Sequence, residues 1–105
     1  MRLRIGDSHL HAGVIIRKRR QAILRLAARH CASRVRLFGS AACGQDTASS
    51  DIDFLVAMEK GRSLFDLINL SQDLEALLGR RVDVVTERGL SPYLRERIYQ
   101  EARPL

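Results

Sequence analysis

The chain has 105 residues, of which 46% are hydrophobic and 29% charged, as expected for one small domain with a single core. Its formal net charge of +6 favours an anionic partner such as a nucleotide, a nucleic acid or an acidic protein surface, without choosing among them. Cys31 and Cys43 have neither disulfide-framework nor metal-site spacing, and no apolar run reaches the roughly 20 residues of a membrane span. We therefore expect a cytoplasmic protein with free thiols and no membrane partner.

The first 13 residues show no clear period and are expected to form a poorly defined arm of the single domain 1–105. His9 and His11 form an H-x-H pair, but no third ligand lies nearby, so we do not expect a metal site there.

Residues 14–30 have the period of an amphipathic helix, with Ile16, Ile23 and Ala27 on its inner side. The opposite side collects basic residues: Arg17, Lys18, Arg25 and Arg29. Basic residues in this arrangement are typical of the solvent-exposed side of an amphipathic helix. The alternative is that they form a stripe that binds nucleic acid.

Two strand candidates follow, at residues 35–38 and 51–57, and the first runs directly into Gly39-Ser40. The second strand alternates in character. Its apolar face is predicted to hold Ile52, Phe54 and Val56, and its other face Asp51, Asp53 and Leu55.

Residues 63–78 form the clearest helix, with Ser63 and Asp66 as a capping box and Gly79 as the stop signal. The predicted buried stripe is Leu64, Leu67, Ile68, Leu74 and Leu78.

Residues 82–86 (VDVVT) predict a third strand, and Ser91-Pro92 predicts the start of a last helix that Pro104 ends. The inner face of that helix is predicted to be Leu94, Ile98 and Ala102. Strands alternating with helices indicate an α/β domain, here with a small mixed three-stranded sheet flanked by helices.

The chemistry is predicted to reside in three carboxylates. Residues two apart on a strand share a face and lie roughly 6.5–7 Å apart, so Asp51 and Asp53 should project together from an otherwise apolar segment. Two unpaired carboxylates there repel each other and lose hydration. A bound divalent cation would relieve both costs, and oxygen ligands suit Mg²⁺.

Asp83 can join them if the third predicted strand pairs with the second, since neighbouring strands are roughly 4.8 Å apart. Three carboxylates can then hold two Mg²⁺ roughly 3.5–4 Å apart, as in two-metal nucleotidyl transfer. The alternative makes Asp51 a turn residue, Asp53 an edge charge and Asp83 a solvent-facing residue.

Gly39 and Ser40 are the predicted phosphate-binding residues. A glycine at the end of a strand lets the backbone approach a ligand closely. If a helical turn begins there, its free N–H groups and the Ser40 hydroxyl face an anion.

The stretches VRLFGS (35–40), SDIDFLV (50–56) and VDVV (82–85) resemble the minimal nucleotidyltransferases of the DNA polymerase β-like superfamily. The resemblance runs from about residue 14 to the end, and the closing SPYLRERIYQEARPL is similar to the last helix of MNT antitoxins, which pair with HEPN toxins.

This resemblance implies roles for five residues. Gly39 and Ser40 would bind the triphosphate, Asp51 and Asp53 would bind Mg²⁺, and Asp83 would be the third ligand and possible base. It also implies an activity, transfer of AMP from ATP to a tyrosine of a cognate HEPN toxin. The oligomeric state is left open between a monomer and a homo- or hetero-oligomer, since so small a domain with many apolar positions can bury a face on a partner.

The phosphate loop departs from the family pattern Gly-Ser-Arg-Ala-Arg-Gly, because Ala41 and Cys43 stand where arginine is usual. An arginine there could neutralise phosphate charge. Arg36, Lys60 or Arg62 are candidate replacements.

Two further hypotheses stay open. In one, the protein is a catalytically weak antitoxin that neutralises its toxin by direct binding. In the other, the basic helix at 14–30 binds nucleic acid, which is disfavoured because it leaves all three aspartates unexplained.

Overall fold

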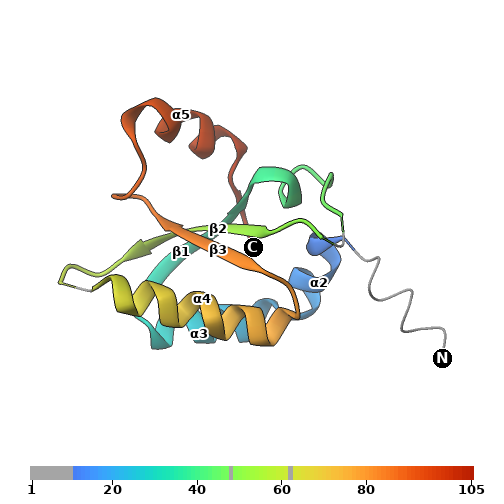
Figure 1. The fold of residues 1–105 in the computed structure, drawn as a ribbon, viewed down its shortest axis with the longest axis horizontal. Coiled ribbons are helices and arrows are strands. Elements are labelled where there is room, and N and C mark those ends of the chain that lie inside the picture. Colours follow the sequence, from blue (N-terminus) through green and yellow to red (C-terminus); the bar gives the residue numbers. More distant parts are fainter. Residues whose placement is uncertain (1–10, 48, 62) are drawn as a thin grey trace.

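A computed structural model describes residues 11–47, 49–61 and 63–105 (Figure 1). The elements in chain order are α2 (Ala12–Lys18), α3 (Arg20–Arg29), β1 (Ala32–Phe38), the 3₁₀ turn η1 (Gly39–Ala41), β2 (Ile52–Met58), α4 (Leu64–Leu78), β3 (Val82–Thr86), α5 (Pro92–Glu101) and β4 (Arg103–Pro104). The domain is therefore α/β, as predicted.

The sheet has four strands in the order β3-β2-β1-β4. β2 and β3 are parallel, whereas β1 is antiparallel to both β2 and β4. The expectation of three strands was one short, because the two residues of β4 carry too little local pattern to predict a strand. They pair with Arg36 and Leu37 of β1 after the chain has passed through α5.

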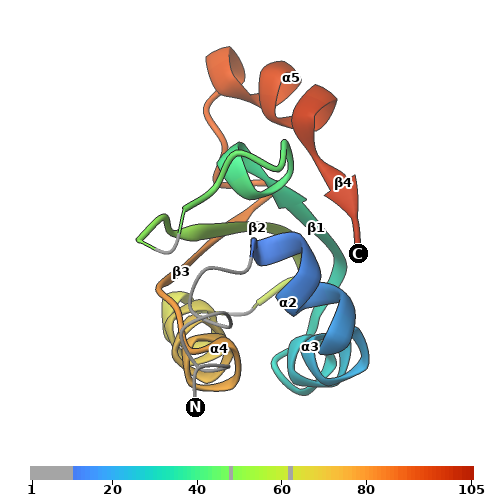
Figure 2. The ribbon, with the colours of Figure 1, turned by 90° about the vertical axis from the view of Figure 1, so that its right-hand side faces the viewer.

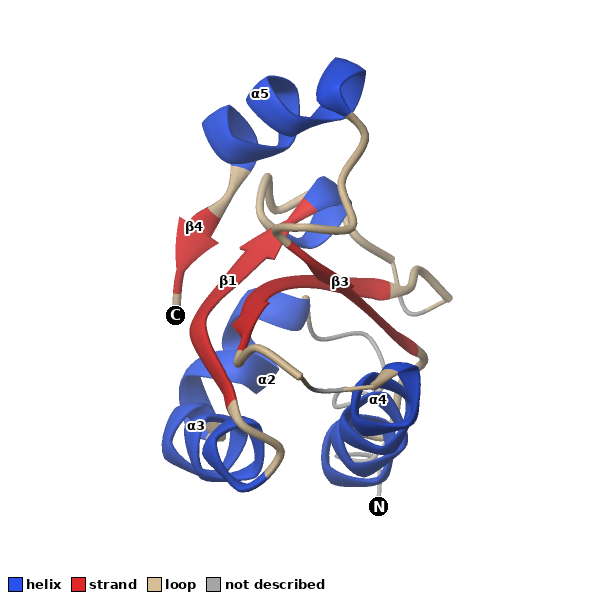
Figure 3. Cartoon of the chain, turned by 90° about the vertical axis from the view of Figure 1, so that its left-hand side faces the viewer, coloured by secondary structure: helices blue, strands red, loops and turns tan. Residues whose placement is uncertain are grey.

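Helices α3 and α4 cover one face of the sheet, while η1 and α5 lie on the other side (Figures 1 and 2). Figure 3 shows the same arrangement from the opposite side, with β4 beside β1 at the edge of the sheet. No helix within the described ranges is both long enough and apolar enough to cross a membrane.

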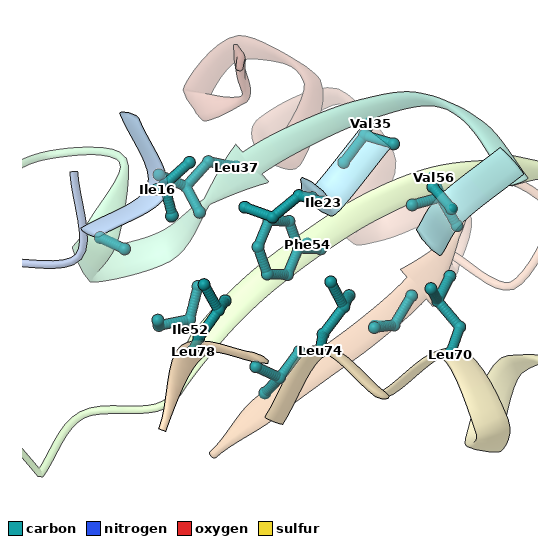
Figure 4. Packing of buried hydrophobic residues seen from close by; sticks show 14 of the residues in the cluster. Ile16, Ile23, Val35, Leu37, Ile52, Phe54, Val56, Leu70, Leu74 and Leu78 are labelled. Atoms are coloured by element: carbon teal, nitrogen blue, oxygen red, sulfur yellow. The ribbon is translucent and has the colours of Figure 1, made fainter. Parts of the chain in front are cut away.

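The core lies between the sheet and helices α3 and α4 (Figure 4). Phe54, Ile52 and Val56 project into it from β2 and are almost completely buried, as the predicted alternation requires. They contact a shared cluster that includes Ile23 of α3 and Leu74 of α4. Burying a side chain of this size contributes about 1.5–3 kcal/mol.

The expected helix at 14–30 is two helices that meet at Arg19. Its predicted inner residues Ile16, Ile23 and Ala27 are buried, and its basic residues are exposed. The expected arm extended to residue 13, but α2 already begins at Ala12. Residues 1–10, including His9, lie outside the described part of the chain.

Helix α4 begins after Ser63 and ends before Gly79, as predicted. The backbone N–H of Ser63 donates to Asp66 Oδ2 at 3.0 Å, and Gly79 takes the left-handed conformation with φ of 70°. The predicted stripe was partly wrong. Leu64 and Ile68 are exposed, while Leu70 is fully buried with Leu74. Leu67 also packs against the core, so the helix contacts the core from Leu67 onward.

Helix α5 begins at Pro92 after Ser91, as predicted, but none of its residues is buried. Leu94, expected on an inner face, is exposed, and Ile98 is half-buried. Ala102 follows the helix and is half-buried. The expectation failed because α5 rises away from the sheet instead of packing flat on it (Figure 2).

Candidate active site

Two of the three predicted carboxylates are direct neighbours across the parallel strands β2 and β3. Asp53 and Asp83 are paired in register, so their side chains leave the sheet on the same face. Phe54 and Val84, the next residues along the two strands, belong to the core on the opposite face. The two aspartates therefore face the side of the sheet that carries η1.

Asp51 immediately precedes β2 and lies two residues before Asp53. It is exposed, and its Oδ1 is 3.3 Å from Nε of Arg81, the residue before β3. The three aspartates thus gather where β2 and β3 both begin.

Gly39 contacts this group directly. Phe38 pairs with Asp53 across β1 and β2, so the chain turns into η1 beside that carboxylate. A Cβ atom at Gly39 would lie 2.5 Å from Asp53 Oδ2, and Gly39 has a φ of 75°. Both facts exclude an ordinary side chain at this position. Ser40 is half-buried within the same turn.

The surroundings of Asp53 disfavour the ionised form of its side chain. Burial, followed by the negative charges of Asp83 and Asp51, raises the pKa of Asp53 to about 6. A cation bound among these carboxylates would remove the repulsion and favour the ionised form.

The donor set fits Mg²⁺ with substrate, though not Mg²⁺ alone. Within the described ranges, no three His, Cys, Asp or Glu side chains already form a metal cage. Mg²⁺ usually binds one or two carboxylates and completes its shell with water and substrate phosphates. Asp53 and Asp83 are the neighbouring pair, Asp51 can join from the edge, and the turn at Gly39-Ser40 is where phosphates could approach.

Of the cations suggested to replace the loop arginines, the two that the structure describes, Arg36 and Lys60, do not lie at this cluster. Arg36 forms an ion pair with Glu87 and lies over the ring of Tyr99, with 5.6 Å between the guanidinium carbon and the ring centroid. Lys60 follows the opposite end of β2, and Arg62 lies outside the described residues. In the loop itself Ala41 is buried and Cys43 is exposed.

The cation beside the cluster is instead Arg81, which the sequence reasoning missed. Arg81 could have been predicted from its position directly before the strand that carries Asp83, because residues at the beginning of that strand lie near the same edge of the sheet. The neighbouring Arg80 was missed too, because its partners Asp46 and Ser50 are 34 and 30 residues away along the chain.

Comparison with known proteins gives a consistent family. The family model described as a nucleotidyltransferase domain matches residues 16–105. A Methanocaldococcus jannaschii relative, provisionally named a protein adenylyltransferase, is 40% identical over 83 residues, covering 79% of this chain and 89% of its own. The protein adenylyltransferase MntA of Thermococcus cleftensis is 39% identical over 67 residues, covering 64% of this chain and 68% of its own.

Solved structures agree. A structure provisionally described as a minimal nucleotidyltransferase superposes with a TM-score of 0.79 at 57% identity, covering 86% of this chain and 92% of its own. A toxin–antitoxin complex with AMP-PNP gives a TM-score of 0.70 at 26% identity, covering 78% of this chain and 68% of the other. On this combined evidence, the chain belongs to the nucleotidyltransferase domain family and has the fold of the minimal nucleotidyltransferases.

Proposed function

We propose that this protein is a Mg²⁺-dependent adenylyltransferase that transfers AMP from ATP to a tyrosine hydroxyl of a HEPN-type toxin. The observation that carries the proposal is the in-register pair Asp53–Asp83 beside Gly39. Relatives named protein adenylyltransferase, and neighbours that are toxin–antitoxin complexes, one of them with AMP-PNP, support the donor and the partner.

Each residue has a role in this proposal. Asp51, Asp53 and Asp83 hold the cation, and Gly39 and Ser40 form the backbone surface against which the triphosphate lies. Bound Mg²⁺ supplies charge neutralisation for the triphosphate and lowers the pKa of the acceptor hydroxyl. The protein itself contributes mainly by positioning the reacting groups, with side chains whose arrangement is fixed before the reaction begins.

The transfer step balances without another co-reactant. The tyrosine oxygen bonds to the α-phosphorus of ATP while the bond from that phosphorus to the bridging oxygen breaks. Pyrophosphate leaves with that oxygen, and Asp83 accepts the hydroxyl proton. The exposed position of Asp83 leaves it open to an acceptor arriving from a partner protein.

The test is a mass measurement on the partner. Purified protein, its cognate toxin, ATP and Mg²⁺ are incubated, and the toxin is weighed by mass spectrometry. We expect an AMP-sized gain that disappears with EDTA and falls by at least about a hundredfold in rate with Asp53→Asn. If the toxin gained AMP at the same rate with Asp53→Asn as with the wild type, the role of the acidic cluster would be refuted.

A second candidate is an antitoxin that neutralises its toxin by binding alone. The loop that lacks arginine, with Ala41 buried and Cys43 exposed, favours it, because the loop brings no cation to the triphosphate. A stable complex that blocks the toxin, with no mass gain in the wild-type reaction, would favour this candidate.

A further inference from the structure

A buried ion pair lies outside the acidic cluster. Asp46, in the loop between η1 and β2, is 2% exposed and is the only buried charged residue among those described. Its Oδ2 accepts from Arg80 Nη1 at 3.0 Å, and the Arg80 side chain is itself only 9% exposed. Arg80 lies in the turn between α4 and β3.

Asp46 also anchors the start of α2. Its Oδ2 accepts the backbone N–H of Ala12 at 2.8 Å, and its Oδ1 is 3.3 Å from His11 Nδ1. Burial raises the pKa of Asp46, but hydrogen bonds from Ala12, Arg80 and His11 outweigh it and hold the pKa below its usual value. The carboxylate is therefore ionised at neutral pH and a strong acceptor.

Arg80 reaches the far end of the same loop. Its Nη2 donates to the backbone carbonyls of Thr47 at 2.6 Å and Ser50 at 2.8 Å. Ser50 directly precedes Asp51, the edge carboxylate of the candidate site. One guanidinium thus fixes the backbone that delivers Asp51.

The near end of the loop is tied to the phosphate turn. The backbone N–H of Gln45 donates to the carbonyl of Ser40 at 2.9 Å, and Gln45 directly precedes Asp46. The described residues of the loop between these ties form no regular strand or helix, so their geometry depends on such anchors. Arg80 and Asp46 therefore connect the phosphate turn at one end to the metal-ligand side at the other.

We propose that Asp46 and Arg80 are positioning residues, which hold the loop between η1 and β2 so that Ser40 and Asp51 have a fixed separation for Mg²⁺ and ATP. The inference rests on the proposed function. A buried ion pair gives little net stability compared with apolar packing, so fixing this geometry is a better account of it than stabilising the fold. Loose positioning alone can cost a large factor in rate.

The test compares Arg80→Gln with Arg97→Gln. Arg97 forms an exposed ion pair with Glu101 on α5, so its loss removes an arginine without touching the loop. Both proteins are assayed for AMP transfer at a temperature where circular dichroism reports a folded protein. We expect Arg80→Gln to raise the KM for ATP and lower kcat/KM by at least about tenfold, with Arg97→Gln unchanged.

Amide hydrogen exchange supplies a readout independent of activity. With Arg80→Gln we expect faster exchange at residues 45–47 and 49–51, and unchanged exchange in β3, because the loss is local. Equal acceleration in the loop and in β3 would mean general destabilisation and would overturn the proposal. Loop exchange and kinetics matching Arg97→Gln would overturn it as well.

Arg80→Lys tests rescue, because lysine keeps the charge but lacks the planar fork that contacts Asp46, Thr47 and Ser50 together. It should recover only part of the lost kcat/KM, and full recovery would contradict the bridging role. Should Arg80→Gln not fold, Arg80→Lys and Asp46→Asn carry the same comparison. A wild-type protein that transfers no AMP refutes the proposed function and the catalytic half of this inference, while loop exchange still decides whether Arg80 holds the loop.

Discussion

The two faces of the seven-residue strand β2 differ in polarity and burial. One face, with Ile52, Phe54 and Val56, is fully apolar and packed against α3 and α4. The other face carries Asp53, half-buried beside Asp83. The first face stabilises the fold by burial, whereas the second keeps like charges close together at a cost.

Side-chain alternation along this single strand separates the residues that stabilise the core from the carboxylate of the candidate site. The acidic face of β2 is not uniformly exposed to solvent. Leu55, on that face, is completely buried although it lies outside the main core. Asp53 is thus held between a buried residue and a charged edge, which raises its pKa. Replacing the carboxylate of Asp53 and truncating a residue of the apolar face should therefore have effects of opposite sign on stability.

The largest expected effect comes from the apolar face. Phe54→Ala removes the largest of the completely buried side chains and should lower the free energy of unfolding by about 3–5 kcal/mol. Urea unfolding followed by circular dichroism measures the change. A loss below about 1 kcal/mol would mean that this face does not carry the core.

Gly39→Ala probes the close approach to the acidic face. The added methyl would lie 2.5 Å from Asp53 Oδ2, at a φ that L residues rarely adopt. We expect a loss of about 1–3 kcal/mol in stability together with weaker ATP binding. Gly44→Ala is the matched control, since Gly44 also has positive φ but a Cβ atom there would meet no described atom within 4 Å. Equal losses in the two variants would assign the cost to backbone strain alone.

Asp53→Asn should stabilise the metal-free protein. The pKa of Asp53 is raised from 3.8 to about 6, so the folded state binds this proton more tightly than the unfolded chain does. Its contribution to stability is therefore greatest below pH 4 and is lost as the pH rises through about 6. The shift sets an upper limit of about 3 kcal/mol, which the half-exposed position reduces to about 1 kcal/mol.

Unfolding in EDTA at pH 8 and at pH 4 measures this. We expect the variant to exceed the wild type by about 1 kcal/mol at pH 8, with the difference vanishing near pH 4. A variant that is less stable than the wild type at pH 8 would show that the acidic face is not under charge repulsion.

The smallest expected effect lies at the start of α4, away from both faces of β2. Phe65 is 74% exposed and Leu64 is 70% exposed. Phe65→Ser should change the free energy of unfolding by less than about 0.5 kcal/mol, measured by the same urea titration. A loss above about 2 kcal/mol would mean that the first turn of α4 contributes to the core.

Local patterns were enough to predict much of this fold, and the expected pairing of the second and third strands places Asp53 beside Asp83. The binding roles of these residues stay a prediction. The alternation along β2, the capping box of Ser63 and Asp66, and the stop at Gly79 are all set by neighbours in the chain. Long-range partners were not predictable in the same way. The pairing of β4 with β1 and the contact of Asp46 with Arg80 join segments far apart in sequence.

The buried stripe of α4 failed for a related reason. Helical period identifies which residues share a side, but the depth of burial depends on where the sheet lies beneath each turn. Leu64 and Ile68 satisfy the period and are nonetheless exposed, whereas Leu70 is buried by its tertiary position. Arg81 was missed likewise, because its ion pair with Asp51 exists only once β2 and β3 lie side by side.

Mn²⁺ titration followed by NMR in the presence of AMP-PNP tests the cation site most directly, because paramagnetic broadening reports which residues lie near the ion. We predict selective loss of signals from residues 39–40, 51–53 and 83, with β4 unaffected, and a sharply weakened response in Asp53→Asn. Broadening centred elsewhere, or an unchanged response in Asp53→Asn, would contradict the assignment of Asp51, Asp53 and Asp83 as cation ligands.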